Sequence, residues 1–266
     1  MNGIIIYNSL DIAKNKWFIS SIINSFKEKG TNVELIEEST LDDKSLNCVD
    51  FAIYRGRDYK ISKSIEDKGI LVINNSKTKK IANDKYLFYQ YLFTHLYPCM
   101  ETYSSIDEVY FSPFVAKPKD GHGGNGVYLL ASKEEYLEKV DLKDRSKYIF
   151  QKPSSDLGID LRVYVLNKRI YGSVLRKAKE GEFRSNFSLG GNVTYFEPPI
   201  EIKELALKIA NEFDSFFVGI DFIVDKGNWI VNEMEDPVGT RMLYQTSSKN
   251  VVSDYVNEMI LKYGLK

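Results

Sequence analysis

Three acidic residues near the carboxyl end of the chain have the spacing of one face of a β-hairpin: Asp221, Glu233 and Glu235. The segment FVGIDFIVDKGNWIVNEME predicts two strands, and a three-residue turn at 226–228 sets Asp221 directly opposite Glu233, with Glu235 on the same face. Opposed side chains in such a pair lie about 5 Å apart at Cβ, where like charges destabilise the sheet. We therefore expect a positive charge between these carboxylates.

A divalent cation is the charge that this set of ligands favours. Carboxylate oxygens without Cys or His select Mg²⁺, with Mn²⁺ as the alternative ion. Asp221 also interrupts an apolar run, where an unpaired carboxylate would be costly or would shift its pKa. The alternative is that the acids lie on a solvated face and pair with Lys or Arg. A slip of one residue in the turn would reverse the faces.

A glycine-rich loop follows an apolar strand that ends at Lys117, in the segment FVAKPKDGHGGNGVYLL. Its four glycines let backbone N–H groups approach an anion, although the spacing fits neither the Walker pattern nor the dinucleotide fingerprint. Alone, the loop would equally be an ordinary hairpin connection, and Lys85 a solvated helix lysine. Beside the acidic residues, however, the two lysines and the loop form a set that holds and covers a triphosphate.

The bulk composition excludes several classes of partner. A formal net charge of -1 provides no basic field for nucleic acid or acidic lipid. No stretch reaches the roughly 18 apolar residues of a membrane span, and the start MNGIIIYNSL lacks a basic region, so we expect a cytoplasmic protein without a membrane partner. Cys48 and Cys99 are predicted to be buried thiols. The two histidines, His95 and His122, disfavour a multi-histidine metal site and a Ser/His/Asp hydrolase.

The order of predicted elements indicates two or three packed lobes in 266 residues. Residues 3–80 alternate β-rich runs with helices, which is typical of a small parallel α/β sheet. A connecting helix follows in DKYLFYQYLFTHL, with Asn83 or Asp84 at its start. From Phe111 onward, strand runs separated by turns and a helix at about 132–140 predict a mixed second lobe.

The last part of the chain predicts a further set of paired strands. LRVYVLNKRIYGSVLRKA indicates two strands that turn at Asn167 and Lys168. A helix at about 201–213, the acidic hairpin and a final helix follow. Long polar loops at 118–126 and 178–192 remain, and such loops on a rigid frame serve function more often than connection.

Together these residues resemble the ATP-grasp superfamily, most closely its RimK-like branch, which contains ligases that add glutamate to a ribosomal protein tail. The likeness runs from about Asp50 to the end of the chain. Its most specific part is RKAKEGEFRSNFSLGG at 176–191, followed in order by VGIDFIV and IVNEME. The resemblance implies an α/β fold with α+β lobes: a small N-terminal parallel domain at 1–80, a central lobe at 81–147 and a C-terminal lobe at 148–266, the last two clamping ATP.

The resemblance also implies roles for single residues. Those that bind the nucleotide are Lys85, Lys117, Gly123, Gly124, Asn125, Gln151, Lys152, Pro153 and Asp160. Within this set, the resemblance assigns the backbone at 151–153 to adenine and Asp160 to the ribose. Asp221, Glu233 and Glu235 fall on the metal-ligand positions, in agreement with the hairpin register. Within the most specific motif, Arg184 with Asn186 beside it is the candidate that stabilises phosphate and oxyanion, and Lys117 acts with them. Guanidinium groups that bind substrate carboxylate or phosphate are predicted at Arg162, Arg176, Arg184 and Arg241, while Arg55 and Arg57 are left open.

The chain departs from the family pattern at several positions. Glu235 stands where the family commonly has Asn, which keeps a metal ligand and adds a negative charge. Residues 236–241 replace a common run of a small residue, Pro and Gly. Ser188 and Leu189 occupy two positions that are often His and Arg. For these reasons the specific RimK substrate is not carried over.

The function predicted from the sequence is an ATP- and Mg²⁺-dependent carboxylate–amine ligase that forms an amide or peptide bond through an acyl phosphate. Its substrates are a small-molecule or peptide carboxylate and an amine. Two alternatives stay open: a small-molecule kinase that stops at phosphoryl transfer, and a nucleotide-binding regulator without turnover. The oligomeric state, a homo-oligomer included, is also left open.

Overall fold

The N-terminal part of the chain forms a parallel α/β sheet, as the sequence predicted. The structure is a computed structural model, and it describes residues 1–179 and 191–265. The strands β1 (Asn2–Tyr7), β2 (Asn32–Glu37), β3 (Phe51–Tyr54) and β4 (Leu71–Ile73) lie in the order β2-β1-β3-β4. All three pairings are parallel, and the apolar runs of β1 and β3 are buried because helices cover such sheets. The intervening helices are α1 (Ser9–Lys27) and α2 (Tyr59–Glu66).

Two helices in succession lead out of this sheet. α4 (Lys85–Thr94) begins after Asp84, whose side chain accepts a hydrogen bond from the Leu87 N–H, so the predicted helix start is confirmed. A further helix, α3 (Ser76–Ala82), precedes it and was not predicted. Its sequence SKTKKIA gives little sign of an amphipathic helix, because two of its three buried residues, Thr78 and Lys79, are polar.

The central lobe contains a four-stranded antiparallel sheet. Its strands β5 (Thr102–Tyr103), β6 (Phe114–Pro118), β7 (Tyr128–Leu130) and β8 (Tyr148–Gln151) lie in the order β5-β8-β6-β7. The helix α5 (Lys133–Lys139) confirms the prediction at 132–140 and buries Tyr136 against the sheet. The glycine-rich segment joins β6 to β7, which are hydrogen-bonded neighbours. Short 3₁₀ helices lie at Glu38–Thr40, Ile106–Glu108 and Leu142–Lys147.

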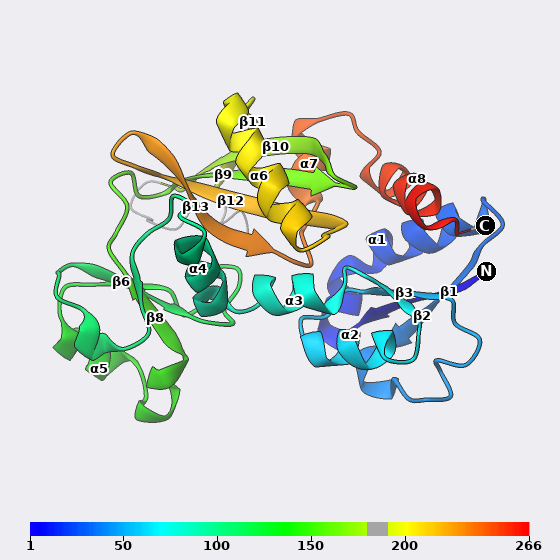
Figure 1. The fold of residues 1–266 in the computed structure, drawn as a ribbon, viewed down its shortest axis with the longest axis horizontal. Coiled ribbons are helices and arrows are strands. Elements are labelled where there is room, and N and C mark those ends of the chain that lie inside the picture. Colours follow the sequence, from blue (N-terminus) through cyan, green and yellow to red (C-terminus); the bar gives the residue numbers. More distant parts are fainter. Residues whose placement is uncertain (180–190, 266) are drawn as a thin grey trace.

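A five-stranded antiparallel sheet forms the remaining lobe (Figure 1). The strands β9 (Ile159–Leu166), β10 (Arg169–Lys177), β11 (Asn192–Tyr195), β12 (Phe217–Asp225) and β13 (Asn228–Glu235) lie in the order β11-β10-β9-β12-β13. The predicted turn between β9 and β10 is confirmed, with positive φ at Asn167 (45°) and Lys168 (64°). The helix α6 (Ile200–Glu212) also lies where it was expected and packs on β9, β10 and β12.

The hairpin of β12 and β13 keeps the predicted pairing of acids, but the predicted turn is wrong. Asp225 pairs with Asn228, so the turn has two residues, Lys226 and Gly227, with φ of 50° and 78°. A β-bulge then shifts the register, because Phe222 pairs with Val231 while Asp221 pairs with Glu233. The extra residue in β13 is Asn232. The bulge cancels the error in the turn and places Asp221 opposite Glu233 after all.

The C-terminal helix α8 (Val251–Tyr263) returns to the N-terminal sheet and lies beside α1 (Figure 1). Its buried residues Val256 and Met259 share one hydrophobic core with Phe18 and Ile22 of α1. The short helix α7 (Arg241–Thr246) packs on β10 and β11. The division of the chain at residues 80 and 147 stays a prediction.

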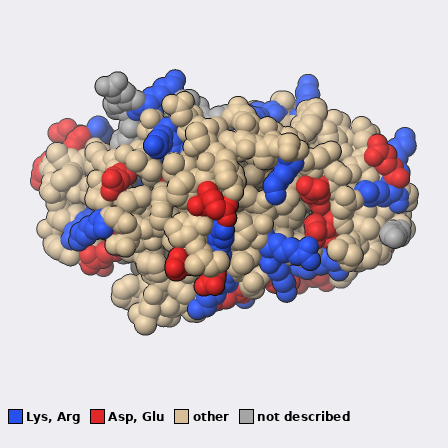
Figure 2. All heavy atoms as spheres, turned by 90° about the horizontal axis from the view of Figure 1, so that it is seen from above, with Lys and Arg blue, Asp and Glu red and all other residues tan. Residues whose placement is uncertain are grey.

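The surface carries charges of both signs. Lys and Arg side chains alternate with Asp and Glu over the face drawn in Figure 2, in keeping with the small net charge. Neither cysteine has a disulfide partner among the described residues. The predicted burial is wrong for Cys48, which lies exposed in a turn, and Cys99 is half-buried. Within the described parts of the chain, we find no helix with the length and apolar character needed to cross a membrane.

Candidate active site

A cavity between the central lobe and the five-stranded sheet brings most of the predicted site residues together. We call it the first cavity. The predicted residues that line it are Lys85, Lys117, Gly123, Gly124, Gln151, Lys152, Asp160, Arg176, Asp221, Glu233 and Glu235. Four predicted site residues that the structure describes do not line it: Asn125, Pro153, Arg162 and Arg241. Arg184 and Asn186 lie outside the described residues.

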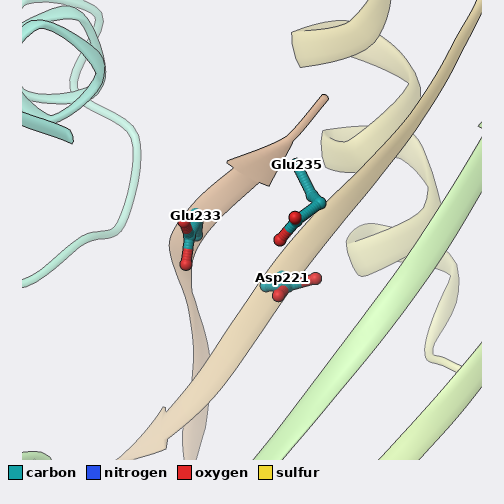
Figure 3. Close-up of side chains that lie close together, drawn as sticks. All are labelled: Asp221, Glu233 and Glu235. Carbon is teal, nitrogen blue, oxygen red and sulfur yellow. The ribbon is translucent and has the colours of Figure 1, made fainter. Parts of the chain in front are cut away.

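The three predicted metal ligands converge in this cavity. Asp221 of β12 and Glu233 and Glu235 of β13 each offer a carboxylate oxygen, and these atoms lie within 4.8 Å of one another. Figure 3 shows the three side chains gathered beside the two strands. Asp221 is buried, whereas the two glutamates are half-buried at the cavity wall. The predicted grouping is therefore present in the fold, while the role of these residues stays a prediction.

Cationic side chains already contact this acidic cluster. Arg162 of β9 donates to both oxygens of Asp221, at 2.7 Å each, and to Oε2 of Glu235 at 3.0 Å. Arg176 of β10 donates to Oδ2 of Asp221 at 2.6 Å and also to Asp160. Burial alone would raise the pKa of Asp221, but Arg162 and Arg176 outweigh it and hold that pKa below its usual range. The alternative that the acids pair with arginine thus holds, although for a buried cluster and not for a solvated face.

The two predicted nucleotide lysines reach the same place from different elements. Lys85, the first residue of α4, forms an ion pair of 2.7 Å with Glu233 and donates to the carbonyl of Gly121 in the glycine-rich loop. Lys117 of β6 donates to Oδ1 of Asn232 at 3.1 Å. Burial lowers the pKa of Lys117 to about 8, and Lys85 adds to the effect while Glu233 opposes it. Glu233, the carboxylate that opposes the effect, is already paired with Lys85.

The residues predicted to bind the adenine and the ribose also line the first cavity, Pro153 excepted. The Gln151 side chain is buried and donates to Oγ1 of Thr102 at 2.7 Å. The Lys152 ammonium lies over the rings of Tyr110 and Phe111, each at 5.2 Å from the centroid. Asp160, predicted to hold a ribose, is buried and paired with Arg176.

A second cavity, of about 430 Å³, adjoins the first and shares His122, Gly123, Arg176 and Glu235 with it. We call it the basic cavity. Its cationic lining residues are Lys14, Arg55, Arg57, Arg162, Arg176 and Arg241. Arg55 and Arg57, whose position the sequence left open, therefore reach the site. Burial and the nearby Arg57 lower the pKa of His122, as expected for a positively charged surrounding.

A buried polar network fixes the chain immediately after the acidic cluster. Lys79 of α3 has no exposed surface, and its ammonium donates to Oδ2 of Asp236 at 2.8 Å and to the carbonyls of Tyr54 and Gly56. The other oxygen of Asp236 accepts from Asn74 at 2.8 Å. One lysine thus ties the segment that carries Arg55 and Arg57 to the residue that follows Glu235.

A family model described as the RimK-like ATP-grasp domain matches residues 94–259, which is more than half of the chain. The chain belongs to the RimK-like ATP-grasp family. Its family and fold were therefore predicted correctly from the sequence. The match begins inside α4 and ends inside α8, so it includes the glycine-rich loop, the acidic hairpin and all arginines of the five-stranded sheet.

Several relatives of this RimK-like chain are synthases. It is 29% identical over 247 residues to the uncharacterized MG011 homolog of Mycoplasma pneumoniae, covering 91% of this chain and 86% of the relative. It is 28% identical to human N-acetylaspartylglutamate synthase A, over 76% of this chain and 56% of that protein. It is 30% identical to glutathione synthetase of Prochlorococcus marinus, over 74% of this chain and 67% of that protein.

Solved ATP-grasp ligases share the fold of this RimK-like chain. D-alanine–D-alanine ligase from Bacillus anthracis, complexed with ATP, has a TM-score of 0.75 and 18% identity and covers 99% of this chain and 97% of its own. The ATP-grasp ligase PsnB, complexed with Mg and ADP among its ligands, has a TM-score of 0.70 and 13% identity, with 98% of each chain covered. At these identities the likeness establishes the fold.

Some site residues were not predicted from the sequence. Asn232 is the bulged residue of β13 and lines the first cavity, and it was missed because a regular hairpin was assumed there. Lys79 and Asn74 were missed because the sequence does not distinguish a buried polar side chain from a solvated one. Asp236 belongs to a segment that departs from the family pattern, and that departure was the one feature of the sequence that could have drawn attention to it.

Proposed function

We propose that this RimK-like chain is an ATP- and Mg²⁺-dependent ligase that joins a carboxylate to an amine through an acyl phosphate. The observation that carries the proposal is the cluster of Asp221, Glu233 and Glu235, with oxygens within 4.8 Å of one another, in a cavity also lined by Lys85 and Lys117. Acids and lysines directed into one cavity suit a nucleotide phosphate with its metal ion. The synthase and ligase names of the relatives support the same reaction class.

The donor atoms of the acidic cluster fit Mg²⁺, with Mn²⁺ as the alternative. They are carboxylate oxygens, and each carboxylate has about four acceptor positions, so its contact with an arginine or a lysine leaves capacity for an ion. Asp221, Glu233 and Glu235 would hold the ion, which when bound would offset negative charge on the transferred phosphoryl group. We expect the two glutamates to contribute most, because both oxygens of Asp221 are engaged by arginines.

The nucleotide would lie in the first cavity. Lys85 and Lys117 are proposed to hold its phosphates, with Gly123, Gly124 and Asn125 in the loop that covers them. Backbone groups at 151–153 would meet adenine, and Asp160 would accept a hydrogen bond from the ribose. The support is positional, since α4, β6 and β8 each contribute to one cavity.

The proposed chemistry has two steps. A carboxylate oxygen of the substrate attacks the γ-phosphorus of ATP, the bond from phosphorus to the ADP oxygen breaks, and an acyl phosphate forms with ADP. An amine then attacks the acyl carbon; phosphate leaves, and the nitrogen loses a proton as the amide forms. The acyl phosphate is needed because a free carboxylate has no competent leaving group. Lys117 would offset charge in the first step, and Arg184 with Asn186 would stabilise the oxyanion in the second.

The substrate carboxylate would enter from the basic cavity. Arg162 and Arg176 were predicted to bind it, but both are occupied by Asp221 and its neighbours. Arg241 lines the basic cavity and forms no ion pair among the described residues, so it is the best placed of the predicted arginines that the structure describes. We place the reaction in the cytoplasm, where ATP is abundant.

The decisive experiment is mass spectrometry of the products from a panel of amino acids and peptides incubated with the protein, ATP and Mg²⁺. We expect ADP and phosphate together with a product lighter by one water than its two precursors. Equal ADP formation without any amine would favour the kinase. Tight MgADP binding without turnover on the whole panel would favour the regulator.

A further inference from the structure

The basic cavity has an excess of positive charge that the protein itself does not neutralise. Glu235 is the acid among its described lining residues. Arg55 donates to the hydroxyl of Tyr7 at 3.2 Å and to the carbonyl of Val238 at 2.9 Å, and within residues 1–179 and 191–265 it forms no direct ion pair. In the same parts of the chain, Arg57 forms a single long ion pair, of 3.8 Å, with Asp11. Guanidinium groups held in this way are prepared for an anionic ligand.

The basic cavity is also lined by apolar and aromatic side chains. Trp17, Phe18, Met242 and Tyr244 contribute apolar surface. Phe18 and Met242 are buried beneath the cavity, whereas Trp17 is 61% exposed at its edge. The Trp17 ring packs edge-on against Tyr244, with 5.3 Å between the ring centroids. When an apolar group covers an exposed aromatic ring in a cavity, apolar surface leaves water and binding becomes more favourable.

Two side-chain hydrogen bonds hold the backbone that precedes Trp17. Asn15 interrupts the helical geometry of α1, with φ of -118° and ψ of 19°, and its side chain donates to the carbonyl of Asp11 at 2.7 Å. The carbonyl of Lys14, at the same interruption, accepts from Arg241 at 3.0 Å. Arg241 therefore links the wall from α1 to the wall from α7, and the cations and the aromatic rings belong to one built cavity.

We propose that the basic cavity binds a carboxylate that carries an aromatic or other large apolar side chain. The carboxylate would contact Arg55, Arg57 and Arg241, and the apolar group would cover Trp17 and Tyr244. A cavity of about 430 Å³ is within the range that accommodates such a ligand. The inference rests on the proposed function, because it names the class of substrate for that site. A free amino acid and the end of a peptide share this chemistry.

Trp17 provides its own reporter for the test. The chain has two tryptophans, and Trp229 lies on β13 outside the cavity, against Phe196. In a Trp229→Phe protein, we expect N-acetyl-L-phenylalanine to change the remaining fluorescence with a saturable dependence. N-acetylglycine should bind about tenfold more weakly, because it lacks the ring. N-acetyl-L-phenylalanine amide, which lacks the carboxylate, should give no saturable change. Tighter binding of Gly-Gly-Phe than of the acetyl amino acid would identify a peptide end as the source.

Variants locate the binding by calorimetry with the same N-acetyl-L-phenylalanine. Arg57→Ala and Trp17→Ala should each weaken binding by about tenfold. Leu10→Ala is the matched control, because Leu10 is also exposed on α1 but does not line the cavity. Equal affinities for the glycine and phenylalanine probes, or no binding of any probe, would overturn the inference. MgADP binding by the unmodified protein is measured in parallel. If MgADP does not bind, the proposed function is contradicted. If MgADP binds but none of the carboxylate probes does, only this inference is contradicted.

Discussion

Lys117 has a lowered pKa, and this gives a prediction for the pH dependence of nucleotide binding. Burial lowers its pKa to about 8, and a bound phosphate would stabilise the charged ammonium and raise that pKa. Nucleotide binding should therefore take up a proton above pH 8. We expect the affinity for MgADP to be constant below that pH and to fall as the pH rises through it, by up to about tenfold per unit. Calorimetry between pH 6.5 and 9.5, in buffers of different ionisation enthalpy, measures both the affinity and the proton uptake.

Lys117→Arg is the control for this pH dependence, because a guanidinium stays charged over the whole range. Its affinity for MgADP should not decline in the same window. A decline of equal steepness in the variant would assign the titration to another group and contradict the role given to Lys117.

Glu233 is the acid whose removal tests the metal assignment most directly. It forms an ion pair of 2.7 Å with Lys85 and contributes to the acidic cluster. Glu233→Gln keeps the shape and removes the charge, so we expect the apparent Mg²⁺ affinity and the turnover to fall by roughly 10- to 100-fold or more. Glu204→Gln, on the exposed face of α6, should leave both unchanged. Normal Mg²⁺ dependence in Glu233→Gln would refute the assignment.

The β12–β13 hairpin shows most clearly which features of the fold could be predicted from the sequence and which could not. Its strands were predicted from the sequence pattern, and the pairing of Asp221 with Glu233 was predicted from an assumed three-residue turn. The turn at Lys226 and Gly227 and the bulge at Asn232 were not, because turn length and bulges depend on cross-strand packing that a single strand does not encode. The two errors are of opposite sign, which is why the acids meet as predicted although the register near the turn does not.

The same contrast holds for the other elements. Segments with strong periodicity or a clear cap, such as α4, α6 and the β9–β10 turn, lie where they were predicted. Elements stabilised mainly by long-range contacts were missed, α3 and α7 among them. Of the candidate site, the residues of the first cavity were predicted through motifs, whereas the basic cavity depends on α1 and α7 meeting in space. No local pattern contains that information.

The two-residue turn itself gives a stability prediction. Gly227 has φ of 78°, and a Cβ added there would meet no atom within 4 Å, so the backbone conformation alone decides the outcome. Gly227→Ala should lower the free energy of unfolding by about 1 kcal/mol, because residues with a Cβ disfavour this region. Gly239→Ala, where there is equal space and no positive φ, is the matched control and should be nearly neutral. Chemical denaturation of both variants measures the difference, and equal stabilities would contradict this account of the turn.

At the scale of the whole molecule, Lys79 joins the N-terminal sheet to the end of the acidic hairpin. Its ammonium contacts the carbonyls of Tyr54 and Gly56 at the end of β3 and the carboxylate of Asp236 after β13. Lys79→Met leaves that carboxylate buried without a counter-charge, so we expect a loss of about 3–5 kcal/mol in the free energy of unfolding. The double variant Lys79→Met/Asp236→Asn should lose less than the sum of the single losses, because neither partner then remains as an isolated charge.

A double-mutant cycle by urea denaturation measures this coupling, and Lys63→Met supplies the control. Lys63 of α2 pairs with Asp67, the residue after that helix, but both side chains are more than half exposed, so its removal should hardly change the stability. If Lys79→Met were as mild as Lys63→Met, the buried pair would not hold the sheets together. A large coupling, in contrast, would mean that the position of Arg55 and Arg57 relative to Glu235 is set by one buried ion pair. The geometry of the basic cavity would then depend on a residue that lines neither cavity.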